Sequence, residues 1–448
     1  MQNKINNIER AVENRRALIL DAERYVWQNP ETGYREWKTN NYLKGKYTEL
    51  GYELTEAGDV PGFYTEIDTG REGPCVLILG ELDSVICPEH PESDRETGAV
   101  HACGHNAQSA ALLGVAAALT DESVVSALCG KIRLCAVPAE ELLEIEYRSS
   151  LRERGVIKYF GGKTEFLSRG YFDGVDMAFM VHTGANVFSV REAHVGCLAK
   201  KIIYKGKSSH AGGAPQLGNN ALYAATCGLN AVNAIRETFR DSDHIRVHPI
   251  MTSGGQMVNA IPSRATLESY VRGRSFDAIT KENKKVNRAF VGAALSLGTN
   301  IEILDYPGYS PEYNDLEMRN VARDAAALAV PSYGFKWDDG YSAGSTEMGD
   351  LSLIMPTVQP FSPGSKGTAH GMDYYIADPV AACVDNAKFQ LAMLTLLLCD
   401  GAKRAKEIIE GFKPQFESKE AFLAYVDSLY DSGDRIEYLA DGTAKVRI

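Results

Sequence analysis

Three short, largely apolar segments, each followed within three residues by acidic or histidine side chains, constrain the fold of this chain more than any other feature. The runs cover residues 76–79, 131–137 and 177–181. A continuous apolar run of this length is typical of a buried strand in a parallel sheet. The carboxyl ends of parallel strands meet at one edge of the sheet, where open α/β folds place their sites. We therefore expect an α/β fold with a mostly parallel sheet and a polar cluster along one edge.

A cysteine and a histidine stand close together after the first run. Residues 101–105 read His-Ala-Cys-Gly-His and precede a small apolar helix that we predict at 107–119. A Cys103 thiolate and a His105 imidazole suit a borderline metal ion such as zinc, manganese or cobalt. Cysteine is also among the most buried residue types, so a core cysteine beside a helix-capping histidine explains the pair equally well by itself.

The other two strand ends extend the pattern. Pro138 ends the second strand, and Glu140 and Glu141 follow it. Neighbouring carboxylates can divide the work, because one can bind a cation while the other accepts a proton from the metal-bound water. A solvated acidic turn is the alternative. His182 comes directly after the third strand, and packing alone does not explain three such strand ends in one chain.

Five segments together resemble the co-catalytic metallopeptidase superfamily, which includes aminoacylases, glutamate carboxypeptidases and N-acyl-amino-acid amidohydrolases. They are Asn-Pro-Glu-Thr-Gly-Tyr at 29–34, Gly-Glu-Leu-Asp at 80–83, His-Ala-Cys-Gly-His at 101–105, Pro-Ala-Glu-Glu at 138–141, and His182. The Cys-Gly-His version looks like the amidohydrolase branch. Within that branch, residues 104–106 and 344–352 look most like the aminobenzoyl-glutamate hydrolase B-subunit type and its dipeptidase relatives.

The resemblance implies a metal site and a general base at the matching positions. Its implied ligands, for one or two divalent ions (zinc, manganese or cobalt), are Cys103, His105, Glu141, His182 and His370. Its implied catalytic residues are Glu140, as the general base, and Asp83. His101 matches no ligand position, and we expect it either to support a ligand from behind or to have a structural role.

Three more residues are implied to contact the substrate. By resemblance, His210 reaches the site of the other protomer and helps hold the carbonyl oxygen in the transition state, although an exposed surface histidine is the alternative. Asn259 and Arg272 are similar to the family's positions that hold a substrate carboxylate. Arginine suits that role because its planar guanidinium forms two parallel hydrogen bonds with a carboxylate.

The order of the expected strands and helices along the chain predicts one domain inserted into another. We expect a catalytic domain at 1–192 and 304–400, an α+β lid and dimerisation domain at 193–303, and a C-terminal appendage at 401–448 with no assigned role. The strands expected in the lid are 197–204 and 265–272, with helices at 219–239 and 277–297. We also expect helices at 6–28 and 404–412, and a hairpin at 436–448 around Asp441-Gly442.

Composition limits the partners and the location. The formal net charge of −12 argues against nucleic acid. No apolar run approaches the roughly 18–20 residues that span a bilayer, which predicts no membrane contact. Nine scattered cysteines suit reduced thiols. We therefore expect a cytoplasmic homodimer that acts on a small molecule with a free carboxylate.

Two departures from the family pattern bear on the substrate class. Asn106 stands where the branch usually has Asp, and it can still accept a hydrogen bond from a ligand histidine but adds no negative charge. The segment 144–170 is longer and more charged than is typical, and it includes Arg148, Arg152 and Arg154.

Three hypotheses on function follow. The first is a metal-dependent amidohydrolase that cleaves the amide bond of an N-acyl amino acid, an aminobenzoyl-glutamate-like compound or a dipeptide. The second is an amidase with Cys103 as the nucleophile, which would survive metal chelation. The third is a catalytically silent partner subunit or binding protein of the same fold, in which a general base would have no use.

Overall fold

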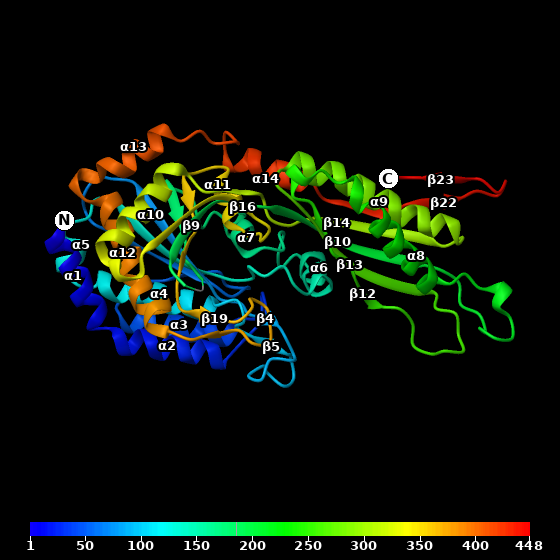
Figure 1. Cartoon of the computed structure of the whole chain (residues 1–448), viewed down its shortest axis with the longest axis horizontal. Helices are drawn as coiled ribbons and strands as arrows, with labels where there is room; N and C mark the ends of the chain where they lie inside the picture. The colour runs from blue at the N-terminus through cyan, green and yellow to red at the C-terminus, as the bar shows by residue number, and fades with distance from the viewer. Residues whose placement is uncertain (185) are drawn as a thin grey trace. The chain divides into compact units, whose positions relative to one another are not determined.

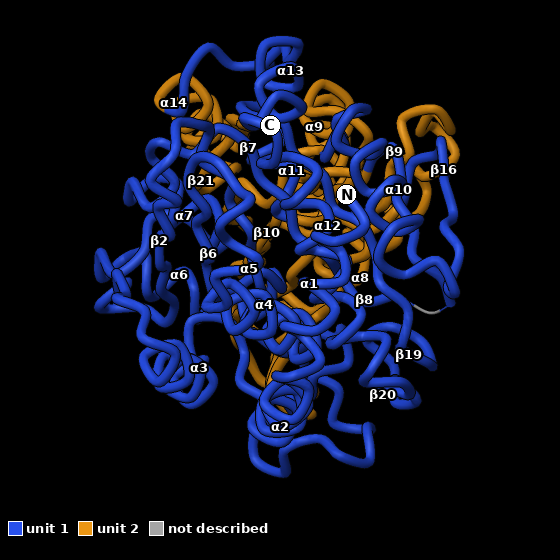
Figure 2. Tube along the Cα trace, turned by 90° about the vertical axis from the view of Figure 1, so that its left-hand side faces the viewer, with its two compact units in different colours: residues 1–193, 312–342, 347–419 blue, residues 194–311, 343–346, 420–448 orange. Residues whose placement is uncertain are grey.

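The computed structural model describes residues 1–184 and 186–448, and these form two compact units (Figure 2). Unit 1 comprises Met1–Ala193, Glu312–Ser342 and Glu347–Lys419. Unit 2 comprises His194–Pro311, Ala343–Thr346 and Glu420–Ile448. Nearly all of the segment expected as an insertion belongs to unit 2. The segment expected as a C-terminal appendage is divided between the units at Lys419.

The main sheet of unit 1 has six strands in the order β1-β2-β6-β3-β7-β17. These strands are β1 (Thr55–Glu56), β2 (Phe63–Asp68), β6 (Lys131–Val137), β3 (Cys75–Glu81), β7 (Met177–Phe179) and β17 (Thr357–Val358). The strands from β6 to β17 run parallel, and β1 and β2 pair antiparallel. Every residue of β3 is buried. The predicted α/β class with a mostly parallel sheet is thus confirmed.

Helix α4 (His105–Leu119) lies at the centre of unit 1, and all its residues are buried. From Ala110 to Leu119 it is apolar on every side, as expected of a helix that is buried on all its faces. The helix starts two residues before the predicted position, because Gly104 adopts a positive φ of 91° and begins it. It packs against α2 (Arg16–Gln28) and α12 (Asn386–Leu398).

The helix expected at 6–28 is wrong as a single element, because it is two helices. They are α1 (Gln2–Glu13) and α2, separated by a turn at Asn14 and Arg15. The turn allows the apolar side chains of both helices to enter one core.

One described helical stretch, Val380–Leu398, is long and apolar enough to cross a membrane. However, 83% of that window is buried inside the structure. Its side chains belong to the core of unit 1, together with those of α4.

The remaining elements of unit 1 surround this core. The helices are α3 (Trp37–Glu49), α5 (Glu122–Val125), α6 (Ile145–Glu153), α7 (Gly162–Ser168), α10 (Leu316–Ala329), α11 (Met348–Ser352) and α13 (Lys403–Gly411). A second sheet contains β15 (Glu312–Tyr313), β9 (Phe188–His194), β18 (Pro360–Ser362), β8 (His182–Thr183) and β16 (Phe335–Ser342). Two small pairs are β4 (Val85–Ile86) with β5 (Ala99–Val100), and β19 (Ser365–Lys366) with β20 (Tyr375–Ile376).

Unit 2 is an antiparallel sheet with helices packed on it (Figure 1). The strand order is β11-β13-β10-β14-β21, and β12 also pairs with β13. The strands are β10 (Gly196–Lys205), β11 (Arg246–Val247), β12 (Ile250–Ser253), β13 (Arg264–Gly273), β14 (Asn300–Pro307) and β21 (Asp431–Asp434). The helices are α8 (Ala221–Ala234), α9 (Phe276–Ser296) and α14 (Lys419–Ser428).

Most of the local predictions for unit 2 are confirmed. Strands β10 and β13 cover the predicted ranges. The helix predicted at 219–239 ends at Ala234, because residues 236–238 form a separate 3₁₀ turn. The expected C-terminal hairpin is formed by β22 (Ile436–Tyr438) and β23 (Ala444–Val446), and Gly442 in its turn has a φ of 85°.

Candidate metal centre

The five predicted ligands lie together in unit 1. Two sets of three side chains each have ligand atoms within 4.8 Å of one another. The first set is Cys103, His105 and His182, and the second is Cys103, Glu141 and His370. Cys103 belongs to both sets, and its Sγ lies 3.5 Å from Nε2 of His182. Cys103 is therefore a candidate ligand in both sets.

The parallel strands and one helix end bring these residues together. Glu141 follows β6 and His182 follows β7, so both lie at the carboxyl ends of strands of the parallel sheet. Cys103 and His105 lie at the amino end of α4. His370 lies in a loop whose backbone is fixed by a hydrogen bond from its N–H to the carbonyl of Ala102 (2.8 Å).

Asp83, predicted as a catalytic residue, holds two of the ligands in place. Nδ1 of His105 lies 2.9 Å from the Asp83 carbonyl oxygen and 3.1 Å from its Oδ1. The backbone N–H of Glu141 donates to Oδ2 of Asp83 at 2.8 Å. Because Nδ1 of His105 is engaged, Nε2 is the nitrogen directed at the centre, as is usual for a metal-binding histidine.

Two buried atoms of the centre support its assignment as a metal site. Neither Nε2 of His105 nor Oε1 of Glu141 makes a hydrogen bond, although both are buried and Nε2 of His105 lies within ion-pair distance of Glu81. Nε2 of His370 approaches Oε1 of Glu141 to 2.9 Å, but without hydrogen-bond geometry. Buried polar atoms without partners are costly. Imidazole, thiolate and carboxylate donors in this arrangement fit a divalent ion of the zinc, manganese or cobalt type.

The charges of the centre favour the metal-binding form of the thiol. Burial and Glu141 raise the pKa of Cys103, but His105 and His182 outweigh them and lower it to about 6. Glu141 raises the pKa of His370 to about 11. In the absence of an ion, the ligands therefore neutralise one another's charge.

Glu140 is close to the centre but belongs to a third set of neighbouring side chains. It lies with Glu81 and His105, whose ligand atoms are within 4.8 Å of its own. It is buried, and burial together with the carboxylates of Glu81 and Glu141 raises its pKa well above the usual range. A carboxyl group whose pKa is raised is a stronger base once it is ionised, and it also returns a proton more readily, as general acid–base catalysis requires.

Three buried residues near the centre were not predicted from the sequence. Glu81 lies with its Oε2 3.1 Å from Nε2 of His105. Lys163 donates from Nζ to Oε1 of Glu81 at 2.5 Å, and its backbone N–H donates to Oε1 of Glu347 at 3.0 Å. All three side chains are fully buried. Glu81 lies inside a motif that carries the family resemblance, whereas no sequence signal distinguishes Lys163 from a surface lysine.

Two polar residues of the motif region have structural roles. His101 is fully buried, neither of its ring nitrogens has a hydrogen-bond partner, and burial lowers its pKa to about 3. Asn106 does not accept a hydrogen bond from a ligand histidine in the structure. Its Nδ2 donates to Glu23 at 2.7 Å, and its Oδ1 has no partner. Asp83 binds the ring of His105 instead.

The remaining candidates, His210, Asn259 and Arg272, belong to unit 2. Nδ1 of His210 accepts the N–H groups of Gly212 (3.2 Å) and Gly213 (2.9 Å), which leaves the ring proton on the exposed Nε2 side. Asn259 is exposed and lies beside His210, because its carbonyl accepts the N–H of Ala211. Arg272 is half-buried on β13 and donates to the carbonyl of Ala343 at 3.4 Å.

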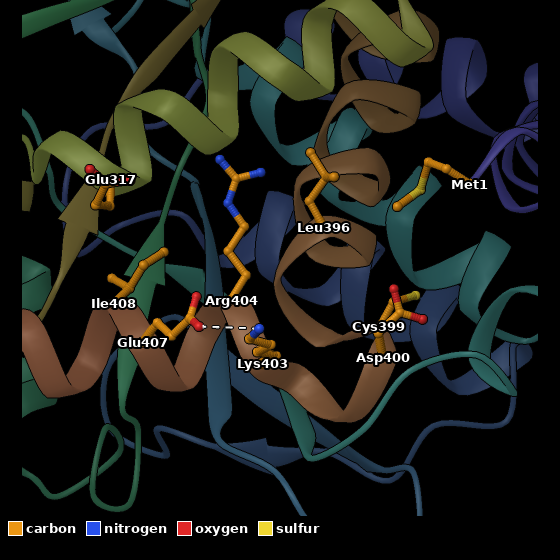
Figure 3. Close-up of a pocket in the computed structure, with 9 residues that line it drawn as sticks. All are labelled: Met1, Glu317, Leu396, Cys399, Asp400, Lys403, Arg404, Glu407 and Ile408. Carbon is orange, nitrogen blue, oxygen red and sulfur yellow. Dashed lines mark ion pairs between the residues drawn. The ribbon is translucent and has the colours of Figure 1, made fainter.

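Unit 1 also has a cavity of about 590 Å³ that none of the predicted site residues lines (Figure 3). Its lining residues are Met1, Glu317, Leu396, Cys399, Asp400, Lys403, Arg404, Glu407 and Ile408. Its basic side chains form ion pairs, with Arg404 2.8 Å from Asp324 and Lys403 3.7 Å from Glu407. Both basic side chains that line this cavity are therefore already paired with carboxylates.

Comparisons with known proteins agree with this geometry. The model of the peptidase family M20/M25/M40 matches residues 77–395. The Xaa-Arg dipeptidase of Homo sapiens is 28% identical, over 92% of this chain and 91% of its own length. The N-acetyl-L-cysteine deacetylase of Bacillus subtilis is 27% identical, over 69% of this chain and 72% of its own. The p-aminobenzoyl-glutamate hydrolase B-subunit of Escherichia coli is 24% identical, over 81% of this chain and 84% of its own.

The fold is also that of solved structures. A dinuclear metal-binding peptidase of the M20 family from Bacillus subtilis superposes with a TM-score of 0.62 at 20% identity, over 86% of this chain and 99% of that one. The resemblance seen in the motifs is confirmed. The chain belongs to the peptidase family M20/M25/M40, as a metal-dependent amidohydrolase.

Proposed function

We propose that this enzyme hydrolyses the amide bond of a small substrate with a free carboxylate, and that it uses two divalent ions. The substrate is an N-acyl amino acid, a dipeptide or an aminobenzoyl-glutamate-like compound. One observation supports the proposal most: two sets of ligand atoms share Cys103, and a buried carboxyl group, Glu140, lies next to them. The names of the relatives support the choice of substrates.

The roles of the residues follow from their positions. Divalent ions bound here would polarise the amide carbonyl and lower the pKa of the attacking water. Glu140 accepts the proton of that water and returns it to the departing amide nitrogen. Glu141 serves as a ligand, and Asp83 orients both Glu141 and His105 through the contacts described above.

Unit 2 is proposed to supply the contacts with the rest of the substrate. The Nε2–H of His210 is an exposed donor suited to a developing oxyanion. Asn259 and Arg272 are proposed to bind the substrate carboxylate. The segment that contains Asn259 borders a cavity of about 360 Å³ in unit 2, lined among others by Gln256, Met257 and Ala260.

We further propose that the enzyme is a homodimer and that His210 acts in the site of the partner protomer. Strand β12 lies at an edge of the unit 2 sheet. Several large apolar side chains on this unit are exposed, namely Leu217, Tyr223, Ile250, Met257 and Val258. Exposed apolar side chains of this kind are typical of a protein–protein contact, and a twofold dimer is the commonest such assembly.

The location and the alternatives follow from the same residues. We propose a cytoplasmic enzyme, since all nine cysteines are free thiols. A nucleophilic role for Cys103 is disfavoured because Cys103 is shared by both sets of ligands. A silent partner subunit is disfavoured because the ligands and the base are all retained.

The test is metal removal and reconstitution. The protein is stripped with a chelator, reloaded with zinc, manganese or cobalt, and assayed on aminobenzoyl-glutamate, N-acetyl amino acids and dipeptides that include Xaa-Arg. We expect hydrolysis only with metal, and we expect Cys103→Ser to lose both metal and activity. The matched control is Cys227→Ser, because Cys227 is exposed and lies outside the centre.

Two outcomes would contradict the proposal. Activity that survives complete chelation would favour the nucleophilic cysteine. Absence of hydrolysis on the whole panel with all three metals would favour the silent subunit.

A further inference from the structure

The segment 144–170 places a buried arginine behind the loop that carries Glu140 and Glu141. Arg148 lies on α6, and its side chain is 1% exposed. Its guanidinium donates to three backbone carbonyls: those of Ala139 (3.2 Å), Phe160 (2.6 Å) and Glu141. Two of the three carbonyls flank Glu140 on either side. The planar fork of arginine allows one side chain to hold both.

The loop held in this way has an unfavourable backbone conformation. Ala139 has a φ of 59°, in the left-handed region that residues with a β-carbon rarely occupy. Its N–H donates to Oε1 of the fully buried Glu36 at 2.7 Å, while its carbonyl accepts from Arg148. The loop is thus fixed on both its N–H side and its carbonyl side. Strain of this kind persists only where the surroundings enforce it.

The packing around Arg148 leaves no room for adjustment. A β-carbon on Gly33 would lie 2.3 Å from Nη2 of Arg148 and 2.9 Å from Cα of Ala139. The segment that contains Gly33 is also tied to the start of α6, because Thr32 donates to Glu144 at 2.5 Å. Gly33 therefore allows Arg148 and the loop to approach each other.

We propose that Arg148 is a positioning residue of this enzyme, which acts by maintaining the turn at Ala139. The turn directs Glu140 toward Glu81 and Glu141 toward Cys103 and His370. Arg148 contacts neither the substrate nor an ion. The inference rests on the proposed function, in which Glu140 is the base and Glu141 a ligand.

The experiment compares Arg148→Met with Arg154→Met in the full-length protein. Arg154 is an exposed arginine at the carboxyl end of the same helix, so the control makes the same chemical change without touching the loop. Zinc affinity is measured by chelator competition, and kcat and KM are measured per bound metal. Thermal unfolding of the metal-free proteins shows that each variant is folded.

We expect Arg148→Met to bind zinc about tenfold to a hundredfold more weakly, because Glu141 is no longer held in place. Its kcat should fall on the order of a hundredfold while KM changes by less than about threefold. Arg154→Met should match the wild type in zinc affinity and in kcat. Arg148→Lys, which keeps the charge but not the planar fork, should be intermediate, and it replaces Arg148→Met if that variant does not fold.

A rescue separates positioning from general destabilisation. Glycine adopts a positive φ without strain, so Ala139→Gly in the Arg148→Met background should restore kcat by about fivefold or more. Because glycine also relieves the strain at this positive φ, thermal unfolding of the single and double variants is measured alongside. A kcat that recovers while the unfolding midpoint stays unchanged indicates positioning, and a kcat that only follows the midpoint contradicts it.

The inference would be overturned if Arg148→Met and Arg148→Lys bind zinc and turn over within about threefold of the wild type. The inference would also be overturned if Arg154→Met lost zinc affinity and turnover to the same extent as Arg148→Met. Failure of the proposed function has a different result, because the wild type would then hydrolyse nothing. The zinc affinities would still show whether Arg148 positions Glu141.

Discussion

Glu140 and Glu141 are neighbours in the chain, yet their side chains belong to different groups. Glu140 lies with Glu81 and His105, and Glu141 lies with Cys103 and His370. Side chains that leave an extended backbone in succession point in opposite directions, and the turn at Ala139 fixes where each one points. The division of roles between ligand and base is therefore a property of the loop.

Conversion of each glutamate to glutamine separates the two roles. Glu140→Gln should keep its metal and substrate affinity while turnover falls on the order of a hundredfold or more, because the amide cannot accept the proton. Glu141→Gln should lose metal first. Metal content and kcat of the two purified variants are the measurements. Near-normal turnover in Glu140→Gln, or loss of its metal as readily as in Glu141→Gln, would reverse the assignment.

Cys103 should react as a thiolate in the metal-free enzyme. Its pKa of about 6 means that the reactive form is already populated below neutral pH. The rate of alkylation by iodoacetamide should rise between about pH 5 and pH 7 and then level off, whereas an ordinary thiol becomes reactive only near about pH 8.5. Mass spectrometry of the Cys103 peptide gives the rate. Bound zinc should protect the thiol, and an inflection above about pH 8 contradicts the prediction.

The candidate ligands that the structure brings together could be predicted from the sequence, whereas the residues that support them could not. Cys103, Glu141 and His182 each stand next to the end of a strand or the start of a helix, and such ends carry a recognisable local signal. Lys163 and Arg148 carry none. A cation within a short helix is usually exposed, and only the long-range approach of Glu81 or of the loop at Ala139 explains the burial of these two.

At the scale of elements, the packing around α4 is tight. A β-carbon on Gly114 of α4 would lie 2.7 Å from Cδ1 of Ile19 and 3.0 Å from Cβ of Ala387. Gly45 of α3 has no atom within 4 Å of such a position. Close packing therefore requires glycine at the first of these helix positions and not at the second.

The same substitution should have opposite effects at these positions. Gly45→Ala should raise the free energy of unfolding by about 0.5–1 kcal/mol, because alanine favours a helix. The free energy of unfolding of Gly114→Ala should be about 1–3 kcal/mol lower than that of Gly45→Ala, because the added methyl group overpacks the core. Urea unfolding of the two metal-free variants tests this difference. Equal stabilities would mean that the contact of α4 with α2 is looser than described.

Elements were predictable where a local signal marks both ends. Strand β6 has the predicted bounds, because Gly130 precedes it and Pro138 follows it. The predicted helix at 6–28 lacked such a signal at its middle. Asn14 and Arg15 are compatible with a helix, and only the requirement that both halves bury their apolar side chains interrupts it there.

At the scale of the whole molecule, the C-terminal segment contributes to both units. Residues up to Lys419 belong to unit 1, and β21 joins the sheet of unit 2 beside β14. This arrangement was not predictable, because β21 is short and its pairing with β14 joins segments that lie far apart in the sequence.

The proposed dimer gives a prediction at this scale. Ile250 on β12 is 62% exposed, and Ile250→Asp should weaken self-association by about tenfold or more, since a buried unpaired charge is costly. The matched control is Leu316→Asp, because Leu316 is 57% exposed on unit 1. Sedimentation velocity at micromolar concentration distinguishes the two. A monomeric wild type, or equal behaviour of both variants, contradicts the proposed contact.

The position of β21 also limits how far this protein can aggregate. A sheet with two open sides can add copies without end, as fibrils do. Here β21 covers the outer side of β14 from Glu302 to Asp305, so among the described residues the side formed by β11 and β12 is the longer open one. In a twofold dimer, the edge formed by β11 and β12 would be covered by the same edge of the partner protomer. The other side ends in β21, which has only four residues and so offers few free backbone groups to a further strand. If the proposed dimer forms through β11 and β12, this short edge strand disfavours growth by strand addition beyond two copies.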